Sequence, residues 1–153
     1  MADRTESRTL VDAAPADVLD VIADFDSYPE WTGAVKKSTV EQEYEDGWPH
    51  EVRFVLDAGV IKDTYTLAYT WDVAEDGTGT VSWTLVQAEQ LLRGLDGSYE
   101  LAAAPGGGTE VTYRLTVDVK IPMLGLLKRK AERVVMDTAL KELKRRVEAL
   151  GVR

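Results

Sequence analysis

The stretch VIKDTYTLAYTWDV, from Val60 to Val73, alternates apolar and polar residues along its length. Its first set of alternate positions is mainly aromatic and aliphatic: Ile61, Tyr65, Leu67, Tyr69 and Trp71. The second set is polar and contains three threonines. Because successive side chains of a strand point to opposite faces, this pattern predicts a long strand with one buried face and one face in water.

The segments on either side of this stretch repeat the same alternation. Their apolar positions are Val52, Phe54 and Leu56, then Val81, Trp83 and Leu85, then Val111, Tyr113, Leu115, Val117 and Val119. The clusters EDG, EDGTG, LDG and PGGGT separate these segments and are typical of turns between strands. The middle of the chain is therefore predicted to be an antiparallel meander.

Helical periods precede and follow the meander. A helix that Pro15 opens follows a short first strand, and a second short helix precedes the meander. After Pro122 an apolar stripe extends over a helix about 40 Å long: Leu124, Leu127, Ala131, Val135, Met136, Leu140, Leu143, Val147 and Leu150. The predicted fold is α+β, with a curved antiparallel sheet of about six to seven strands around a long C-terminal helix. Residues 1–153 are expected to form one domain.

The segment ADFDSYPEWTGAV lies between the first helix and the meander. Pro29 disfavours a helical conformation at Tyr28, so a helical segment should end or restart there. This leaves Trp31 free to fold back against the sheet. We expect Trp31 to be a wedge that closes one end of the cavity or core, with contact to a ligand as a second interpretation.

Composition and charge exclude several classes of protein. The chain has 153 residues, 44% of them apolar and 29% charged, which is typical of a globular protein. It has no cysteine for a disulfide or thiolate site, and its net charge of -9 argues against binding nucleic acid. No segment resembles a signal peptide or a membrane span, so a cytoplasmic location is expected.

The expected interior is unusually rich in tyrosine. Tyr65, Tyr69, Tyr99 and Tyr113 would point into one space together with the tryptophans of the strands. Buried hydroxyls need hydrogen-bond partners. They either satisfy one another in a solid core or line a cavity that holds an amphipathic ligand.

The order of these elements resembles the START-like or SRPBCC superfamily, in particular its polyketide cyclase/dehydrase and coenzyme Q-binding branch. The resemblance rests on Ala14-Pro15, on Tyr28-Pro29-Glu30-Trp31, on Gly108-Thr109 before the last strand, and on Pro122 with Gly125 before the final helix. It implies a helix-grip fold with a deep hydrophobic cavity for lipids, polyketides or isoprenoids, and no cofactor. The residues expected to bind this ligand are Phe54, Tyr65, Leu67, Tyr69, Trp71, Trp83, Tyr99, Tyr113, Leu127, Ala131 and Val135.

Family members that cyclise aromatic polyketides are expected to place an arginine and a tyrosine in the cavity. The matching positions fall near Val35 for the tyrosine, and near Ala68 or Tyr69 for the arginine. Neither position holds an arginine in this sequence. The arginines that do occur in the strands fall on the polar face. This departure weakens the prediction of cyclase chemistry.

Three residues are candidates for acid–base chemistry. Tyr69 lies on the apolar face, and His50 is the only histidine, so a multi-histidine metal site is not expected. His50 is interpreted as a strand-end or surface residue, or alternatively as a general base at the cavity rim. Asp63 shares the phase of Tyr65 and is interpreted as a strand end in solvent, or alternatively as an inward acid.

The segment IPMLGLLKRK at the start of the final helix is apolar on both sides. It is either a helix start that loops cover or an entrance to the cavity, to which Met123, Leu124 and Trp31 would contribute. Residues 120–153 contain ten Lys and Arg against four Asp and Glu. This basic segment either complements the acidic body or makes transient contact with an anionic membrane.

Three functions follow as hypotheses. The first is binding or carriage of a hydrophobic small molecule in a cavity between the sheet and the final helix. The second is a cyclase or dehydrase acting on a ligand in the same cavity. The third is a protein-interaction module similar to ribosome- or quinone-associated relatives. The sequence does not determine the ligand or the oligomeric state.

Overall fold

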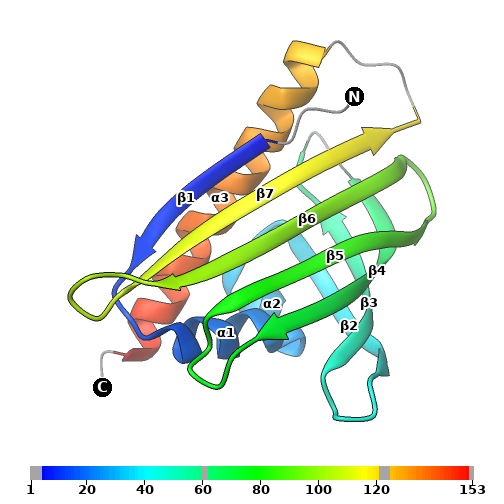
Figure 1. Cartoon of the computed structure of the whole chain (residues 1–153). Helices are drawn as coiled ribbons and strands as arrows, with labels where there is room; N and C mark the ends of the chain where they lie inside the picture. The colour runs from blue at the N-terminus through cyan, green and yellow to red at the C-terminus, as the bar shows by residue number, and fades with distance from the viewer. Residues whose placement is uncertain (1–4, 60–61, 121–124, 152–153) are drawn as a thin grey trace.

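The computed structural model describes residues 5–59, 62–120 and 125–151, and side chains from residue 128 onward in the last range. Within these ranges seven strands form one antiparallel sheet in the order β1-β7-β6-β5-β4-β3-β2 (Figure 1). The strands are β1 (Thr5–Val11), β2 (Val35–Glu43), β3 (Pro49–Asp57), β4 (Lys62–Val73), β5 (Gly79–Ala88), β6 (Leu92–Ala103) and β7 (Thr109–Val119). The meander predicted from the alternating segments is confirmed, because β2 to β7 pair consecutively. The prediction of a turn at LDG was wrong, since residues 95–97 lie within β6 and pair with β7.

The helices lie where their sequence periods predict them. Helix α1 (Pro15–Ala23) has its proline in the first turn, and it is followed by a 3-10 turn (Phe25–Ser27) and by α2 (Tyr28–Trp31). Helix α3 (Gly125–Gly151) crosses behind β1 and β7 in Figure 1 and contacts both strands. The helix-grip architecture is therefore confirmed. Within the described residues, no helix combines the length and the apolarity that a membrane crossing requires.

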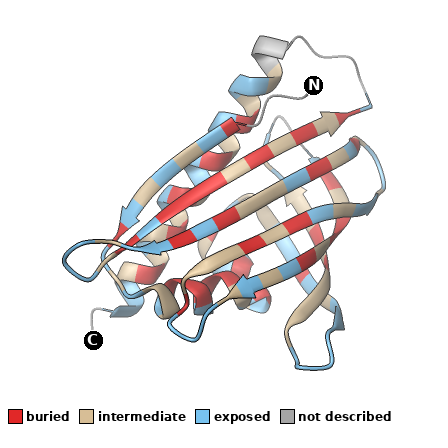
Figure 2. Cartoon of the chain, viewed as in Figure 1, coloured by how far each residue is buried: buried red, intermediate tan, exposed pale blue. Residues whose placement is uncertain are grey.

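The core lies between the inner face of the sheet and one face of α3. Red and pale segments alternate along the strands in Figure 2, as the pattern of the sequence requires. The four buried apolar residues of α3 are spaced three or four positions apart: Met136, Leu140, Leu143 and Val147. Leu150, predicted to continue this stripe, is 39% exposed, so the buried stripe ends at Val147.

The strand register brings the inward aromatic side chains together. Tyr69 pairs with Trp83 across β4 and β5, and Tyr99 pairs with Tyr113 across β6 and β7. The ring centroids are 5.7 Å and 4.7 Å apart, respectively, and those of Trp83 and Tyr113 are 5.7 Å apart. Directly opposed residues on one face of a sheet lie close enough for such contacts. The aromatic positions of separate strands thus form one continuous surface.

A new short helix, α2, begins at Tyr28, directly before Pro29. This agrees with one of the two predicted outcomes, in which the helical segment restarts there. Tyr28 adopts a right-handed helical conformation, although the residue before a proline usually avoids it. Its buried side chain explains this exception, since the Tyr28 hydroxyl donates a hydrogen bond to the Ile22 carbonyl at 2.5 Å. Tertiary packing therefore overrides the local preference at this position.

Candidate ligand-binding cavity

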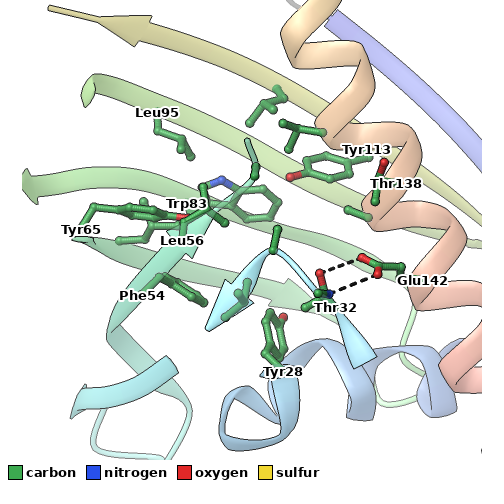
Figure 3. A pocket seen from close by; sticks show the side chains of 18 of the residues that line it. Tyr28, Thr32, Phe54, Leu56, Tyr65, Trp83, Leu95, Tyr113, Thr138 and Glu142 are labelled. Atoms are coloured by element: carbon green, nitrogen blue, oxygen red, sulfur yellow. Dashed lines mark hydrogen bonds between the residues drawn. The ribbon is translucent and has the colours of Figure 1, made fainter. Parts of the chain in front are cut away.

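A cavity of about 400 Å³ lies between the sheet and α3. Five strands, the segment from α2 into β2, and the middle of α3 contribute its walls (Figure 3). A space of this size falls within the range of small-molecule pockets. Of the two arrangements that the sequence left open, the structure therefore has the tyrosine side chains around a cavity and not in a solid core.

Most of the residues predicted to bind a ligand line this cavity. They are Phe54, Tyr65, Leu67, Tyr69, Trp83, Tyr99, Tyr113 and Val135. Trp31, predicted as a wedge at one end, also lines it and lies edge-on to Tyr28 at 5.0 Å between ring centroids. The period-two pattern of the strands therefore placed the aromatic side chains on the correct face.

Two predicted ligand-binding residues lie elsewhere. Trp71 does not line the cavity, because its ring packs on Trp48 and its Nε1–H donates a hydrogen bond to the Pro49 carbonyl at 2.6 Å. Ala131 lies on α3 but is also absent from the cavity wall. These two side chains therefore lie outside the cavity wall, since a shared strand face or helix stripe extends further than the cavity does, and their contact with a ligand stays a prediction. Met123 and Leu124, and the side chain of Leu127, lie outside the described residues.

Asp63 is not a strand end in solvent, so this interpretation was wrong. The residue is 4% exposed, and its carboxylate accepts hydrogen bonds from the backbone N–H groups of Thr64 and of residues 89–92. Burial acts to raise its pKa, but the backbone hydrogen bonds from residues 90–92 and Thr64 outweigh burial and lower the pKa. This carboxylate holds the β5–β6 connection and does not line the cavity.

His50 lies at the second position of β3, in agreement with the strand-end interpretation. Its imidazole stacks on the Tyr44 ring with the centroids 4.3 Å apart. The residue is absent from the cavity wall, so the structure gives no support to the alternative role as a base at the rim. Of the three acid–base candidates, only Tyr69 lines the cavity.

Several residues of the wall were not predicted. They are Tyr28, Thr32, Gly33, Ala34, Val35, Leu56, Asp57, Ala58, Leu95, Leu115, Val117, Val134, Thr138, Ala139 and Glu142. On α3 the members 134, 138 and 142 are spaced four residues apart, next to the buried stripe. This helical spacing is visible in the sequence. However, the three side chains are apolar, hydroxyl and acidic, respectively, so a search for apolar stripes does not find them.

Glu142 joins α3 to the opposite wall of the cavity. Its carboxylate accepts hydrogen bonds from the Thr32 hydroxyl at 2.9 Å and from the Gly33 backbone N–H at 3.2 Å (Figure 3). Nearby, Arg146 of α3 forms an ion pair with Glu30 of α2 at 3.3 Å. Helix α2 and the start of β2 are therefore attached to α3 through side chains that remain partly accessible.

The tyrosine hydroxyls that face the cavity have no protein partner in the described part of the chain. This holds for Tyr65, Tyr69, Tyr99 and Tyr113. Burial disfavours the phenolate and raises the pKa of all four above the ordinary value, with smaller contributions from neighbouring groups for all but Tyr113. At neutral pH they are therefore protonated hydrogen-bond donors.

A family model described as "Polyketide cyclase / dehydrase and lipid transport" matches residues 1–148. The chain belongs to this family. No curated protein sequence matches the chain. The family assignment agrees with the helix-grip architecture and with a fold that binds ligands, and the START-like resemblance of the sequence is confirmed.

Solved structures show the same fold at low sequence identity. A START superfamily protein from Mycobacterium smegmatis is 22% identical, with a TM-score of 0.87 over 96% of this chain and 98% of that one. A protein from Thermus thermophilus is 20% identical, with a TM-score of 0.76 over 97% and 99%. The Zhui aromatase/cyclase from Streptomyces sp. R1128 is 15% identical, with a TM-score of 0.77 over 97% and 94%.

Proposed function

We propose that this protein binds or carries a hydrophobic small molecule in the cavity between the sheet and α3. The observation that carries the proposal is the cavity itself, a space of about 400 Å³ whose wall consists mainly of apolar and aromatic side chains. Transfer of apolar surface from water into such a space is favourable. The fold of the family supports the same function.

The placement of the acid–base candidates favours binding over turnover. His50 stacks on Tyr44 away from the cavity, and all the hydrogen bonds of the Asp63 carboxylate are made to backbone N–H groups. Tyr69 lines the cavity, but its raised pKa makes it a donor and a poor base. A cyclase or dehydrase would need a proton acceptor, and none of the three candidates supplies one at this surface. The two carboxylates of the wall are engaged by other groups, Asp57 by Lys62 and Glu142 by Thr32 and Gly33.

The experiment is native mass spectrometry of the freshly purified protein, followed by solvent extraction of any bound compound. We expect a reproducible apolar compound on the parent protein. Ala139→Phe and Val135→Phe place a ring in the cavity and should abolish this adduct. Ala149→Phe, on an exposed position of the same helix, is the matched control and should retain it.

Two results would contradict the proposal. The first is the same adduct on parent, Ala139→Phe and Val135→Phe proteins of unchanged circular dichroism. The second is a parent protein that carries nothing and also fails to take up any apolar probe. Tyr69→Phe preserves shape and removes one hydroxyl, so a carrier should still bind its ligand, with an affinity lowered by no more than one hydrogen bond, whereas an enzyme that uses the hydroxyl should retain binding but lose turnover.

A further inference from the structure

The charged residues of the cavity wall are all acidic within the described part of the chain. They are Asp57 at the end of β3 and Glu142 on α3. The Asp57 carboxylate is 3.8 Å from the Lys62 ammonium, which partly compensates its charge. Glu142 accepts hydrogen bonds only from the uncharged Thr32 and Gly33, and no described cation lies within ion-pair distance of it.

Two described cationic side chains lie near Glu142 but bind other groups. Lys36 donates a hydrogen bond to the Gly33 carbonyl at 2.8 Å, and Arg146 pairs with Glu30. Neither lies in the cavity wall. A carboxylate or phosphate that entered the cavity would therefore meet the carboxylate of Glu142, which forms no ion pair with a described residue, and no described cation of the wall would replace its water.

The uncharged polar groups of the wall are mainly donors. The hydroxyls of Tyr65, Tyr69, Tyr99 and Tyr113 donate no hydrogen bond to a described residue, although the four side chains line the cavity. These tyrosines come from β4, β6 and β7, and Figure 3 shows Tyr65 and Tyr113 at separate parts of the wall. A ligand that supplies oxygen atoms would accept hydrogen bonds from these hydroxyls, which a hydrocarbon cannot do.

From this arrangement we infer that the ligand is an uncharged ring compound that carries carbonyl, ether or hydroxyl oxygens, and that the cavity selects against carboxylates such as fatty acids. The inference rests on the proposed function, because it concerns the selectivity of the same cavity. The aromatic wall favours a flat ring system, since rings stack on rings. The donors favour oxygen acceptors, and Glu142 disfavours anions.

The test uses three two-ring probes substituted at the same carbon: methyl naphthyl ketone, ethylnaphthalene and naphthoate. Each is titrated with the full chain by isothermal titration calorimetry at neutral pH. We expect the ketone to bind about tenfold more tightly than the hydrocarbon, because it accepts a hydrogen bond from the wall. Naphthoate should bind most weakly of the three.

Variants separate the two parts of the inference. Tyr113→Phe and Tyr69→Phe should lower the affinity for the ketone and leave that for the hydrocarbon unchanged. Glu142→Gln should raise the affinity for naphthoate by about tenfold, since it removes the opposing charge. Asp137→Asn, an exposed change on the same helix and outside the wall, should have no effect.

The outcomes distinguish this inference from the proposed function. Equal affinities for the ketone and the hydrocarbon, or a naphthoate affinity equal to that of the ketone, would overturn the inference while the cavity still binds ligands. If none of the three probes binds while native mass spectrometry still finds an apolar adduct, this inference fails and the proposed function stands. If neither experiment finds binding, both fail. A preference for the ketone that Tyr113→Phe and Tyr69→Phe both leave unchanged would show that these hydroxyls are not the donors.

Discussion

The Asp63 carboxylate on β4 accepts a hydrogen bond of 2.8 Å from the backbone N–H of Leu92, 29 residues further along the chain. The same carboxylate accepts from Leu91, Gln90 and Glu89, so one side chain satisfies the turn that joins β5 to β6. Buried backbone N–H groups require acceptors. Asp63 thus takes the place of a strand partner for this turn.

Asp63→Asn should destabilise the protein by about 3 kcal/mol, because it removes the charge and one of the two acceptor oxygens. Urea denaturation followed by circular dichroism measures this change. Asp76→Asn is the matched control: its carboxylate also accepts from a turn, at Thr78, but it lies in solvent and should cost below about 1 kcal/mol. Equal losses for the two variants would show that Asp63 does not have the role described.

The same carboxylate makes stability depend on acid pH. Its pKa is lower in the folded protein than in the unfolded chain, so the unfolded chain takes up the proton first as the pH falls. Its contribution is therefore complete above the ordinary pKa of an aspartate and is lost as the pH falls through the lower pKa of the folded state. The free energy of unfolding of Asp63→Asn should fall less steeply over this acid range than that of the parent.

Glu132→Ala should destabilise the protein by about 2–4 kcal/mol, because it leaves two groups without an acceptor. Glu132 is 1% exposed on α3, and it accepts from the Thr5 hydroxyl at 2.7 Å and from the Val117 backbone N–H at 2.6 Å. It thereby joins the helix to both β1 and β7. Chemical denaturation measures the loss.

Asp137→Ala provides the control for Glu132. Asp137 lies on the same helix and also accepts from β1, through the Ser7 hydroxyl at 2.6 Å, but this contact is exposed to water. Its loss should cost below about 1 kcal/mol, since water replaces the carboxylate. A smaller effect at Glu132 than at Asp137 would contradict the importance assigned to burial.

Gly97→Ala should destabilise the protein by about 1–3 kcal/mol and weaken ligand binding. A Cβ atom at Gly97 would lie 2.5 Å from ring carbons of Trp83, which is closer than any ordinary contact. Because the Trp83 ring lines the cavity, a shift of this ring changes the wall that a ligand would contact. The measurements are thermal unfolding and calorimetric titration with methyl naphthyl ketone.

Gly94→Ala is the control on the same strand. Its nearest neighbour would be the Asp118 Cβ at 3.3 Å, a contact that a small shift of one side chain relieves. We expect a change below about 1 kcal/mol and unchanged binding of the ketone. The assignment of Trp83 as a rigid wall would be wrong if both glycine variants retained the parent's affinity.

The local periods of the sequence determined the fold. Apolar and polar residues alternate along β4 and its neighbours, which requires a sheet with one buried face. The apolar stripe of α3 around Met136 and Leu140 covers this face. These periods also placed Tyr65, Tyr69 and Tyr113 on the inner face. They depend only on the direction in which each backbone projects its side chains, so they can be read from the sequence alone.

Only the tertiary structure decided where the cavity ends and which polar groups face it. Trp71 shares a strand face with Tyr69 but packs on Trp48, and Asp63 shares that face but is bound by a turn from another part of the chain. Glu142 lies in the wall because α3 passes next to Thr32. Such partners are distant in sequence, so no local pattern contains them, whereas the fold itself follows from periods that every strand and helix carries within its own residues.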